Sequence, residues 1–400
     1  MSWERTTLGN IADIFSGYAF KSADMNTENG TPLLKIKNIA NSRVSSECDT
    51  FLNVDFDLSK YNRFLLRKDD FLVAMTGQGS VGRIGKMINY KSGYYVNQRV
   101  AIVRVNGQKA NPKFVFSQIA TQENEKELFK KANGAGQPNI SAKQIGELEI
   151  ALPNIEIQNK IANILSAYDD LIENNQKQIK LLEEAAQRLY KEWFVDFRFP
   201  GYETTPITDG VPQGWRKGIL DDIVYESGKN EKKENRENYL YYLPIDCLPK
   251  HSIGYTETSD VCLAESSLVA FSKNDIVFGA MRPYFHKVIV ARDSGLTRST
   301  CFVLNARESE FWAYVAMLMF SKDTVDYATQ ISVGTTMPYA RWKDLKQMPI
   351  IVPTSKIAEE FQINIRPIIG KIGVLSEAIM ELREARDCLL PKLMSGELEV

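Results

Sequence analysis

Apolar residues recur in heptad register along two stretches of the chain, one after residue 154 and the other after residue 354. In the first stretch these positions are Leu165, Ile172, Ile179, Leu182 and Leu189, and in the second they are Ile368, Leu375, Ile379, Leu382 and Leu389. Sustained apolar heptads are typical of helices that pair along a coiled-coil seam. We therefore predict two long helices, over residues 154–198 and 354–400, that pack together along these residues. The alternative is that each helix packs only on its own domain.

The second helical pattern contains residues that disfavour a helix. Pro367, Gly370 and Gly373 lie within it. Proline removes a backbone donor and clashes with the preceding turn. We expect a short helix first and a straight helix from about Ile368.

The two remaining stretches, residues 1–153 and 199–353, carry short β-branched and aromatic runs. Such runs predict strands at 71–74, 94–96 and 100–103, and again at 275–280, 287–291 and 301–304. Helices are expected at 114–131 and 310–320. Each stretch therefore has the pattern of a mixed α/β domain, and the fold class is α+β.

The chain repeats itself at an interval of 200 residues. Residues 134–145 resemble residues 334–345, with Pro138 matching Pro338, and the agreement continues without a gap into the two helical patterns. Two long copies exclude a solenoid, whose period is about 20–50 residues. The sequence predicts two copies of one domain-plus-helix module, related by pseudo-two-fold symmetry.

Composition narrows the class of protein. The chain has no apolar run near membrane-spanning length and opens on no secretory signal, and its five cysteines are scattered. We expect a cytoplasmic protein with reduced thiols. The net charge is −1, but residues 67–113 carry a local charge of +7 and residues 278–307 a local charge of +4. Because both segments follow the same strand in each copy, their recurrence favours a phosphate-facing surface over two solvated strand faces.

Motifs for catalysis are missing from the sequence. Residues 77–82 fit the dinucleotide pattern GxGxxG, but no helix start follows, and no acidic residue occurs about 20 positions later. We interpret this segment as a turn between strands. The two histidines, His251 and His286, have no metal-ligand spacing. These observations favour a recognition or scaffold protein over an enzyme, with no metal or cofactor of its own.

Three motifs resemble those of one known family. They are Arg188–Phe197 at the end of the first helix, Leu389–Glu397 at the end of the second, and Pro212–Trp215. Together they are similar to the DNA-specificity subunit of type I restriction–modification enzymes, and the resemblance covers the whole chain. It implies two target-recognition domains, at 1–153 and 199–353, joined by two antiparallel spacer helices.

The resemblance also implies a function and partners. Each recognition domain would read one half of a bipartite, asymmetric target in double-stranded DNA, and the paired helices would fix the gap between the halves. The chain itself would be non-catalytic. Two modification subunits, which carry S-adenosylmethionine and methylate adenine, would dock on it, and restriction subunits that use ATP and Mg would join them. The alternative within the family is an orphan or antagonist paralogue that binds modification subunits without supporting restriction.

Candidate DNA-binding residues lie on glycine-punctuated turns in or beside the basic segments. Arg, Lys, Asn and Gln read base edges or hold phosphates. In the first domain the candidates are Gln78, Ser80, Arg83, Lys86, Gln98, Arg99, Gln137 and Asn139, with Lys35, Lys37 and Asn38 as a second set. In the second domain they are Arg282, Tyr284, His286, Arg298, Thr335, Thr336, Tyr339 and Arg341. The loop at 334–341 departs from the form that the family has at this place, whereas the loop at 134–141 follows it.

Overall fold

The chain folds into two compact units. The structure is a computed structural model that describes residues 3–88, 90–132, 138–265 and 267–400. Unit 1 contains the chain up to Asp169 together with Ala385–Val400, and unit 2 contains Asp170–Glu384. The two long helices, α5 (Ile155–Tyr190) and α9 (Ser355–Ser395), therefore each contribute to both units. The predicted mixed α/β fold with an internal repeat is confirmed.

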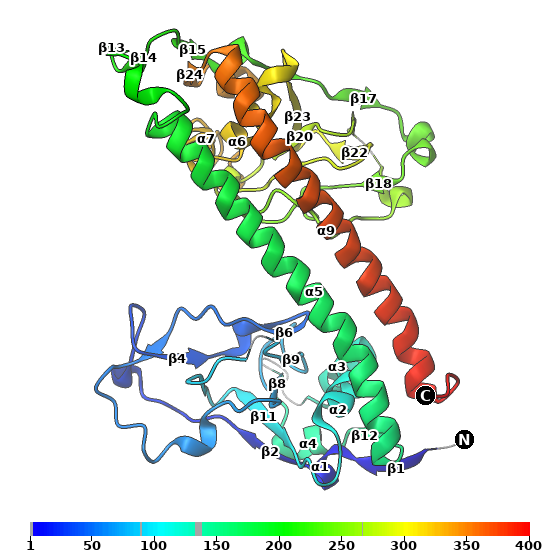
Figure 1. Cartoon of the computed structure of the whole chain (residues 1–400). Helices are drawn as coiled ribbons and strands as arrows, with labels where there is room; N and C mark the ends of the chain where they lie inside the picture. Colours follow the sequence, from blue (N-terminus) through cyan, green and yellow to red (C-terminus); the bar gives the residue numbers. More distant parts are fainter. Residues whose placement is uncertain (1–2, 89, 133–137, 266) are drawn as a thin grey trace. The chain divides into compact units, whose positions relative to one another are not determined.

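Unit 1 is built around a six-stranded sheet with the order β2-β11-β8-β9-β6-β5 (Figure 1). These strands are Ala12–Ser16, Val100–Val105, Phe71–Ala74, Ile84–Lys86, Ser42–Val44 and Ile39–Ala40. A second sheet has the order β10-β4-β7-β3, comprising Tyr95–Val96, Thr31–Leu34, Phe51–Leu52 and Met25–Asn26. A separate ladder pairs β1 (Glu4–Thr7) with β12 (Glu149–Leu152).

Unit 2 repeats this arrangement. Its main sheet has the order β16-β23-β20-β21, comprising Val224–Glu226, Cys301–Ala306, Ile276–Gly279 and Val288–Val290. The second sheet, β17-β19-β22-β18, comprises Lys229–Glu231, Leu268–Phe271, Gly295–Arg298 and Tyr241–Tyr242. Strand β15 (Arg216–Ile219) pairs with β24 (Pro349–Val352), as β1 pairs with β12. The main sheets of the two units thus share the order of four strands, β2-β11-β8-β9 in unit 1 and β16-β23-β20-β21 in unit 2.

The single helix predicted over residues 114–131 is wrong, because the chain turns in the middle. The structure has α2 (Pro112–Ile119) and α3 (Gln122–Lys131), and α4 (Ala142–Gly146) follows. The Thr121 hydroxyl caps α3 by accepting from the Asn124 amide at 3.2 Å. The Asn124 side chain donates to the Ile119 carbonyl at 3.1 Å, which satisfies the end of α2. Unit 2 has the same break between α6 (Trp312–Met319) and α7 (Lys322–Gln330), and α8 (Trp342–Leu345) follows.

The expected early break in the second long helix is also wrong. α9 runs through Pro367, Gly370 and Gly373 as one helix of 41 residues. Phe361, Ile365 and Ile369 on one face of α9 are buried in the core of unit 2, on both sides of the proline. Helical stability in proteins comes mainly from such packing, which here offsets the local cost of the lost backbone hydrogen bond.

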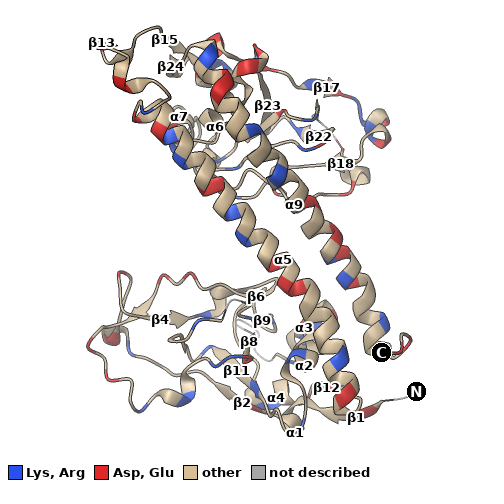
Figure 2. Cartoon of the chain, viewed as in Figure 1, with Lys and Arg blue, Asp and Glu red and all other residues tan. Residues whose placement is uncertain are grey.

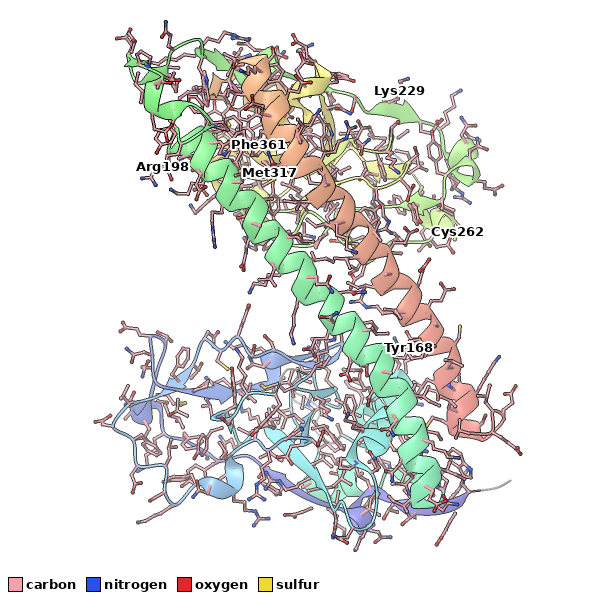
Figure 3. The ribbon with its side chains drawn as sticks, viewed as in Figure 1. Tyr168, Arg198, Lys229, Cys262, Met317 and Phe361 are labelled. Atoms are coloured by element: carbon pink, nitrogen blue, oxygen red, sulfur yellow. The ribbon has the colours of Figure 1, made fainter. Side chains whose placement is uncertain are left out.

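Within unit 2 the helices meet along an apolar seam. From α5 the seam contains Ile172, Ile179 and Leu182. From α9 it contains Ile368, Ile372, Leu375, Ile379 and Leu382. Further along, Tyr190, Trp193 and Phe194 contact the ring of Phe361 near the start of α9. This order of contacts makes the two segments antiparallel in unit 2. Phe361 and Met317 both belong to the core that anchors them (Figure 3).

The remaining predicted seam residues pack on domain cores. Leu189 lies against the core of unit 2. Leu165 is buried in unit 1, in the same cluster as Leu389 and Leu393 from the end of α9. Arg386 and Asp169 add an ion pair at 2.7 Å beside this cluster. The end of each long helix is thus part of the core of the unit that holds the beginning of the other.

Candidate nucleic-acid interface

Three separate segments of unit 1 meet at the end of strand β8. The Met75 amide donates to the carbonyl of Arg99 at 2.9 Å, and the Ile140 amide donates to the carbonyl of Met75 at 2.9 Å. The Gly77 amide donates to the carbonyl of Pro138 at 3.2 Å. These bonds bring together the turn at 76–83, the turn at 97–99 and the segment around Asn139. We call this set of loops the first loop cluster.

Unit 2 builds the same arrangement at the end of β20, with the same hydrogen-bond register. The Ala280 amide donates to Thr300 at 2.9 Å, and the Ala340 amide donates to Ala280 at 2.9 Å. The Arg282 amide donates to the carbonyl of Pro338 at 2.7 Å. We call the loops at 281–286, 298–300 and 333–341 the second loop cluster. Arg282 thus occupies the backbone position that Gly77 occupies in the first cluster.

Most of the predicted residues of the first domain lie on the first loop cluster. Gln78, Gln98, Arg99 and Asn139 are exposed, whereas Ser80 and Arg83 are half-buried. Arg83 lines a pocket of about 430 Å³ beside the start of α3. Gln137 lies outside the described residues.

Three predicted cations or amides of this domain are engaged elsewhere. Lys86 forms an ion pair with Asp69 at 2.7 Å and is largely buried, so it is a poorer candidate for DNA contact than its position in the sequence indicated. Lys37 is paired with Asp49. The buried Asn38 side chain accepts from the Lys35 amide at 2.9 Å and donates to the Glu47 carbonyl at 2.8 Å, which is turn chemistry.

The second loop cluster presents a different set of side chains. Tyr284, Arg298, Thr335 and Thr336 are exposed. Arg282 is half-buried, adopts a positive φ of 50°, and donates from Nη2 to the Thr336 carbonyl at 3.3 Å. Its guanidinium therefore links the β20 end of the cluster to the loop at 333–341.

The other three candidates of the second domain are held in place by their own unit. The Nε2 atom of His286 lies 2.8 Å from the Phe320 carbonyl, and burial lowers the pKa of the imidazole, which favours its neutral form. The Tyr339 hydroxyl donates to Ser299 at 3.3 Å, and Arg341 pairs with Asp344 at 2.6 Å. The hydrogen bonds of Tyr339 and His286 therefore hold the loops of the cluster on the rest of unit 2.

The charge of the two basic segments is less available than their composition indicates. Arg104 is paired with the buried Asp70, Lys109 donates to the Asn10 carbonyl, and Arg307 is paired with Asp221. Positive and negative residues are interspersed along the elements of each unit (Figure 2). The predicted basic surface is therefore confined to a few exposed cations, among which Arg99 and Arg298 lie on the loop clusters.

The glycine-rich segment 77–82 forms a turn between β8 and β9, as predicted, and no helix follows it. Gly82 has a φ of 87°, and a Cβ atom there would lie 2.7 Å from the Glu125 carbonyl oxygen. The Glu125 carboxylate accepts from the Ile84 amide at 3.0 Å. The glycines therefore allow the turn to pack closely on α3, so that they serve the fold of the turn.

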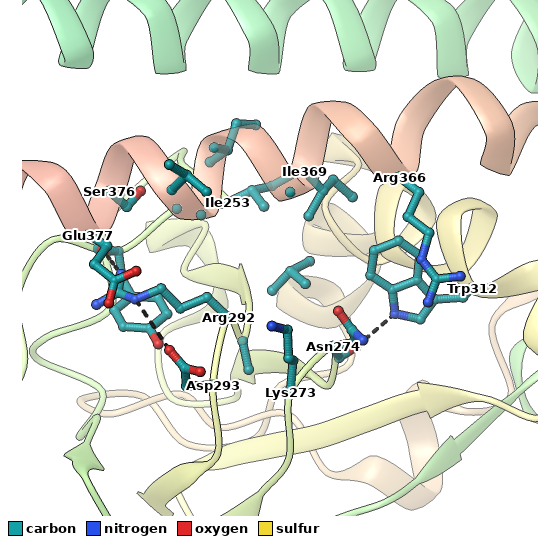
Figure 4. A pocket seen from close by; sticks show the side chains of 18 residues that line it. Ile253, Lys273, Asn274, Arg292, Asp293, Trp312, Arg366, Ile369, Ser376 and Glu377 are labelled. Carbon is teal, nitrogen blue, oxygen red and sulfur yellow. Dashed lines mark hydrogen bonds and ion pairs between the residues drawn. The ribbon is translucent and has the colours of Figure 1, made fainter.

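Unit 2 also contains a pocket of about 470 Å³ between α9 and the edge of its main sheet (Figure 4). Its wall is open where Gly370 and Gly373 leave α9 without side chains. Lys273 and Arg366 lie at its rim, while Arg292 donates to the Tyr255 carbonyl at 2.9 Å. Asp293 and Glu377 also line the pocket and carry the opposite charge. None of the residues that line it belongs to the second loop cluster.

Two further kinds of site are absent from the part of the chain that the structure describes. No group of three or more His, Cys, Asp or Glu side chains is placed to hold a metal ion there. Over the same residues, no helix combines the length and the apolar character needed to cross a bilayer.

The fold and the site define a protein of two repeated domains, each of which carries the same three-loop cluster. The family model described as type I restriction modification DNA specificity domain matches residues 1–184. The MjaIX specificity subunit of Methanocaldococcus jannaschii is 32% identical over 295 residues, which span 67% of this chain and 65% of that relative. The HindI specificity subunit of Haemophilus influenzae is 22% identical over 465 residues, which span 99% of each chain.

A solved structure agrees with this assignment at the level of the fold. The S subunit of a type I restriction–modification system from M. genitalium superposes with a TM-score of 0.61 at 15% identity, over 98% of this chain and 96% of that one. The chain belongs to the family of type I restriction enzyme specificity subunits. The resemblance predicted from the terminal helix motifs is confirmed.

The sequence did not single out two exposed apolar residues of the second loop cluster. Val333 and Met337 are 46% and 54% exposed. Met337 stands 200 positions after Gln137, which was a candidate in the first domain. The alignment of the two copies could have identified Met337.

Proposed function

We propose that the chain is the DNA-binding specificity subunit of a type I restriction–modification complex. Each loop cluster reads one half of a bipartite, asymmetric target, and the chain itself catalyses no reaction. The observation that carries the proposal is the shared hydrogen-bond register of the two clusters, which present different side chains on the same backbone frame. A protein that reads two different half-sites needs this combination of a constant frame and variable tips.

The proposed partners follow from the family. Two modification subunits dock on the long helices and adjoining domain flanks, and they supply S-adenosylmethionine and the adenine methylation. Restriction subunits supply ATP hydrolysis with Mg. The chain acts in the cytoplasm, where DNA and these partners are present.

Sequencing of methylated bases tests the proposal directly. DNA from cells that express the chain with its modification subunits should carry methyladenine in one bipartite motif. Replacing residues 1–152 with the corresponding domain of a relative should change one half of that motif and leave the other half intact. A motif that changes in both halves, or in neither, would contradict the assignment of one half-site to each domain.

The spacer role of the helices has its own test. Four residues inserted after Gln178 lengthen α5 by about 6 Å and add roughly one helical turn, so the apolar seam stays near its phase. The expected motif keeps both half-sites and has a longer gap. A two-residue insertion at the same place is the control, since it rotates the seam away from its partner and should abolish methylation. An active four-residue variant with the original gap would show that the helices do not set the distance.

The alternative of an antagonist paralogue is not favoured, because the relatives are named as subunits of restriction enzymes. An antagonist paralogue and a specificity subunit would differ in one measurable result. A paralogue of that kind would bind modification subunits yet leave unmodified phage DNA uncut in cells that contain all three subunits.

A further inference from the structure

The tip of the second loop cluster is an uncharged hairpin whose base is fixed. The amide and carbonyl of Val333 and Tyr339 bond to each other in both directions at 3.0 Å. Gly334 turns the chain with a φ of 96°, a conformation that favours glycine. From Ile331 to Ala340 the sequence contains no Lys, Arg, Asp or Glu. The hairpin therefore offers no charged side chain for a phosphate.

Neighbouring residues hold the hairpin firmly from below. The Arg282 amide binds the Pro338 carbonyl at 2.7 Å, and its guanidinium binds the Thr336 carbonyl at 3.3 Å. The Tyr339 ring packs against the core of unit 2, 6.2 Å from the ring of Phe302. A preorganised loop of this kind keeps its tip in one place with little loss of conformational entropy on binding.

Apolar side chains are displayed at this fixed tip. Met337 is 54% exposed, and Val333 is 46% exposed at the foot of the same hairpin. Single exposed apolar residues are common and need no explanation. Here two of them flank the exposed Thr335 and Thr336, whose methyl groups extend the apolar surface within a cluster that also presents Tyr284 and Arg298.

We propose that Met337 reads the 5-methyl group of a thymine in the half-site of the second domain. This inference rests on the proposed function and assigns a chemical group to one residue of that site. The thymine methyl is the apolar group on the major-groove edge of a base pair, and apolar side chains recognise it. In the first copy the aligned residue is Gln137, an amide of the kind that pairs with adenine, so the two loops differ in the chemistry that they can read.

Uracil scanning tests this assignment, because deoxyuridine lacks only the methyl group of thymidine. Once the methylated motif is known, each thymine of a duplex carrying it is replaced in turn, and equilibrium binding by the chain in complex with its modification subunits is measured. One position in the second half-site should weaken binding by roughly fourfold, the value expected for one buried methyl group. The Met337→Ala variant should bind the thymine and uracil duplexes equally, and Met337→Leu should restore most of the difference.

Controls separate this inference from general effects. Leu263→Ala removes a side chain of similar exposure, 62%, from another element and should leave the uracil effect unchanged. The inference is wrong if the second half-site contains no A·T pair, or if uracil has no effect there. It is also wrong if uracil weakens Met337→Ala as much as the unmodified chain. A complex that binds no duplex specifically would instead contradict the proposed function itself.

Discussion

Arg104 donates two hydrogen bonds to the buried carboxylate of Asp70, at 2.9 and 2.6 Å. In unit 2 the corresponding carboxylate, Asp275, accepts from the amide of Asn305 at 2.7 Å and the hydroxyl of Ser227 at 2.9 Å. Both aspartates also accept from the backbone at the entry to the central strand, at 2.8 Å. The two copies thus retain one buried carboxylate and satisfy it with a cation in one case and neutral groups in the other.

Replacing Arg104 with alanine should destabilise unit 1 strongly, because Asp70 would keep a buried charge without its partner. Loss of one member of a buried pair costs about 3–5 kcal/mol, and the partial exposure of Arg104 places the expected value near the lower end. Hydrogen exchange of the β8 amides would report the change locally. Arg5→Ala is the control, since its ion pair with Glu149 is exposed and should contribute less than about 1 kcal/mol. Equal effects of the two substitutions would contradict this account.

The helix seam predicts a sharp contrast between two positions on α5. Ile179 is 7% exposed and packs with Ile372, Leu375 and Ile379, whereas Leu181 is 64% exposed. Ile179→Asp places a carboxylate among apolar side chains and should cost several kcal/mol of unfolding free energy. Leu181→Asp should change it by about 0.5 kcal/mol or less. Urea unfolding of both variants gives the comparison, and similar midpoints would refute the packing role of the seam.

Glu183 on α5 should make the stability of unit 2 depend on pH. Its carboxylate accepts from the Ser252 hydroxyl at 2.6 Å and from the Ile253 amide at 2.7 Å. Burial raises the pKa of this carboxyl above its ordinary value of 4.5, and the two hydrogen bonds offset only part of that increase. The folded chain therefore binds the proton more tightly than the unfolded chain, so this contribution to stability is lost as pH rises above 4.5.

The Glu183→Gln variant tests that dependence, because an amide oxygen can accept the same hydrogen bonds without titrating. Its unfolding free energy relative to the unmodified chain should increase from pH 5 upward and then level off. Glu183→Ala should instead lose stability at every pH, since two buried donors lose their acceptor. Glu192→Gln, at an exposed site on the same segment, should show no such trend. A flat difference for Glu183→Gln would refute the burial argument.

Two glycines of unit 2 should respond in opposite directions to an added methyl group. A Cβ atom at Gly370 of α9 would meet no atom within 4 Å, and glycine in a helix costs about 0.5–1 kcal/mol relative to alanine. Gly370→Ala should therefore raise the melting temperature. At Gly254 the Cβ atom would lie 2.7 Å from Ile372 Cγ2, so Gly254→Ala should destabilise by about 1–3 kcal/mol. A lower melting temperature for Gly370→Ala would contradict the open wall of the pocket.

Arg99 should contribute to DNA affinity at every sequence if it contacts a phosphate. Arg99→Ala should then weaken binding to all duplexes and lower the slope of log affinity against log salt by about 1. Arg5→Ala, which also removes an exposed arginine from unit 1, should leave the slope unchanged. If Arg99 reads a base, specificity at one position of the first half-site should relax instead, at about 1–3 kcal/mol. Unchanged affinity and unchanged specificity would remove Arg99 from the interface.

Much of the fold could be predicted from periodicity alone. The apolar heptads identified the pairing of Ile179 with Leu375 and Ile379, and the β-branched runs identified the central strands β8 and β20. The errors arose where tertiary packing overrode a local preference. Helix α9 continues through Pro367 because residues on both sides of the proline are buried. In unit 1, Thr121 caps α3 and so divides a pattern that predicts one helix into two.

The interface was harder to predict than the fold. Turn chemistry placed Gln78, Gln98 and Asn139 on exposed loops, yet nothing in the sequence shows that the Gly77 amide binds the Pro138 carbonyl. Lys86 and Arg104 form ion pairs with Asp69 and Asp70, which lie on other parts of the sequence. These pairs depend on the register of the strands and could not be read from the sequence. Composition therefore overstated the basic character of segment 67–113. The alignment of the two copies points to position 337, whereas the exposure of the Met337 side chain follows from the folded hairpin.

The sharing of helix ends between the two units has a consequence for how such chains diversify. The domain formed by residues 1–152 packs on the long helices through apolar helix residues that include Ile161, Leu165 and Leu393, and Asn111 adds hydrogen bonds to Gln158 and Asn159 of α5. A gene exchange that imports a new domain thus needs to preserve a short patch of contacts, while its loops are free to differ. Such a chain can therefore acquire a new target and keep its old assembly, because changes in the loops do not alter the contacts between the domain and the helices.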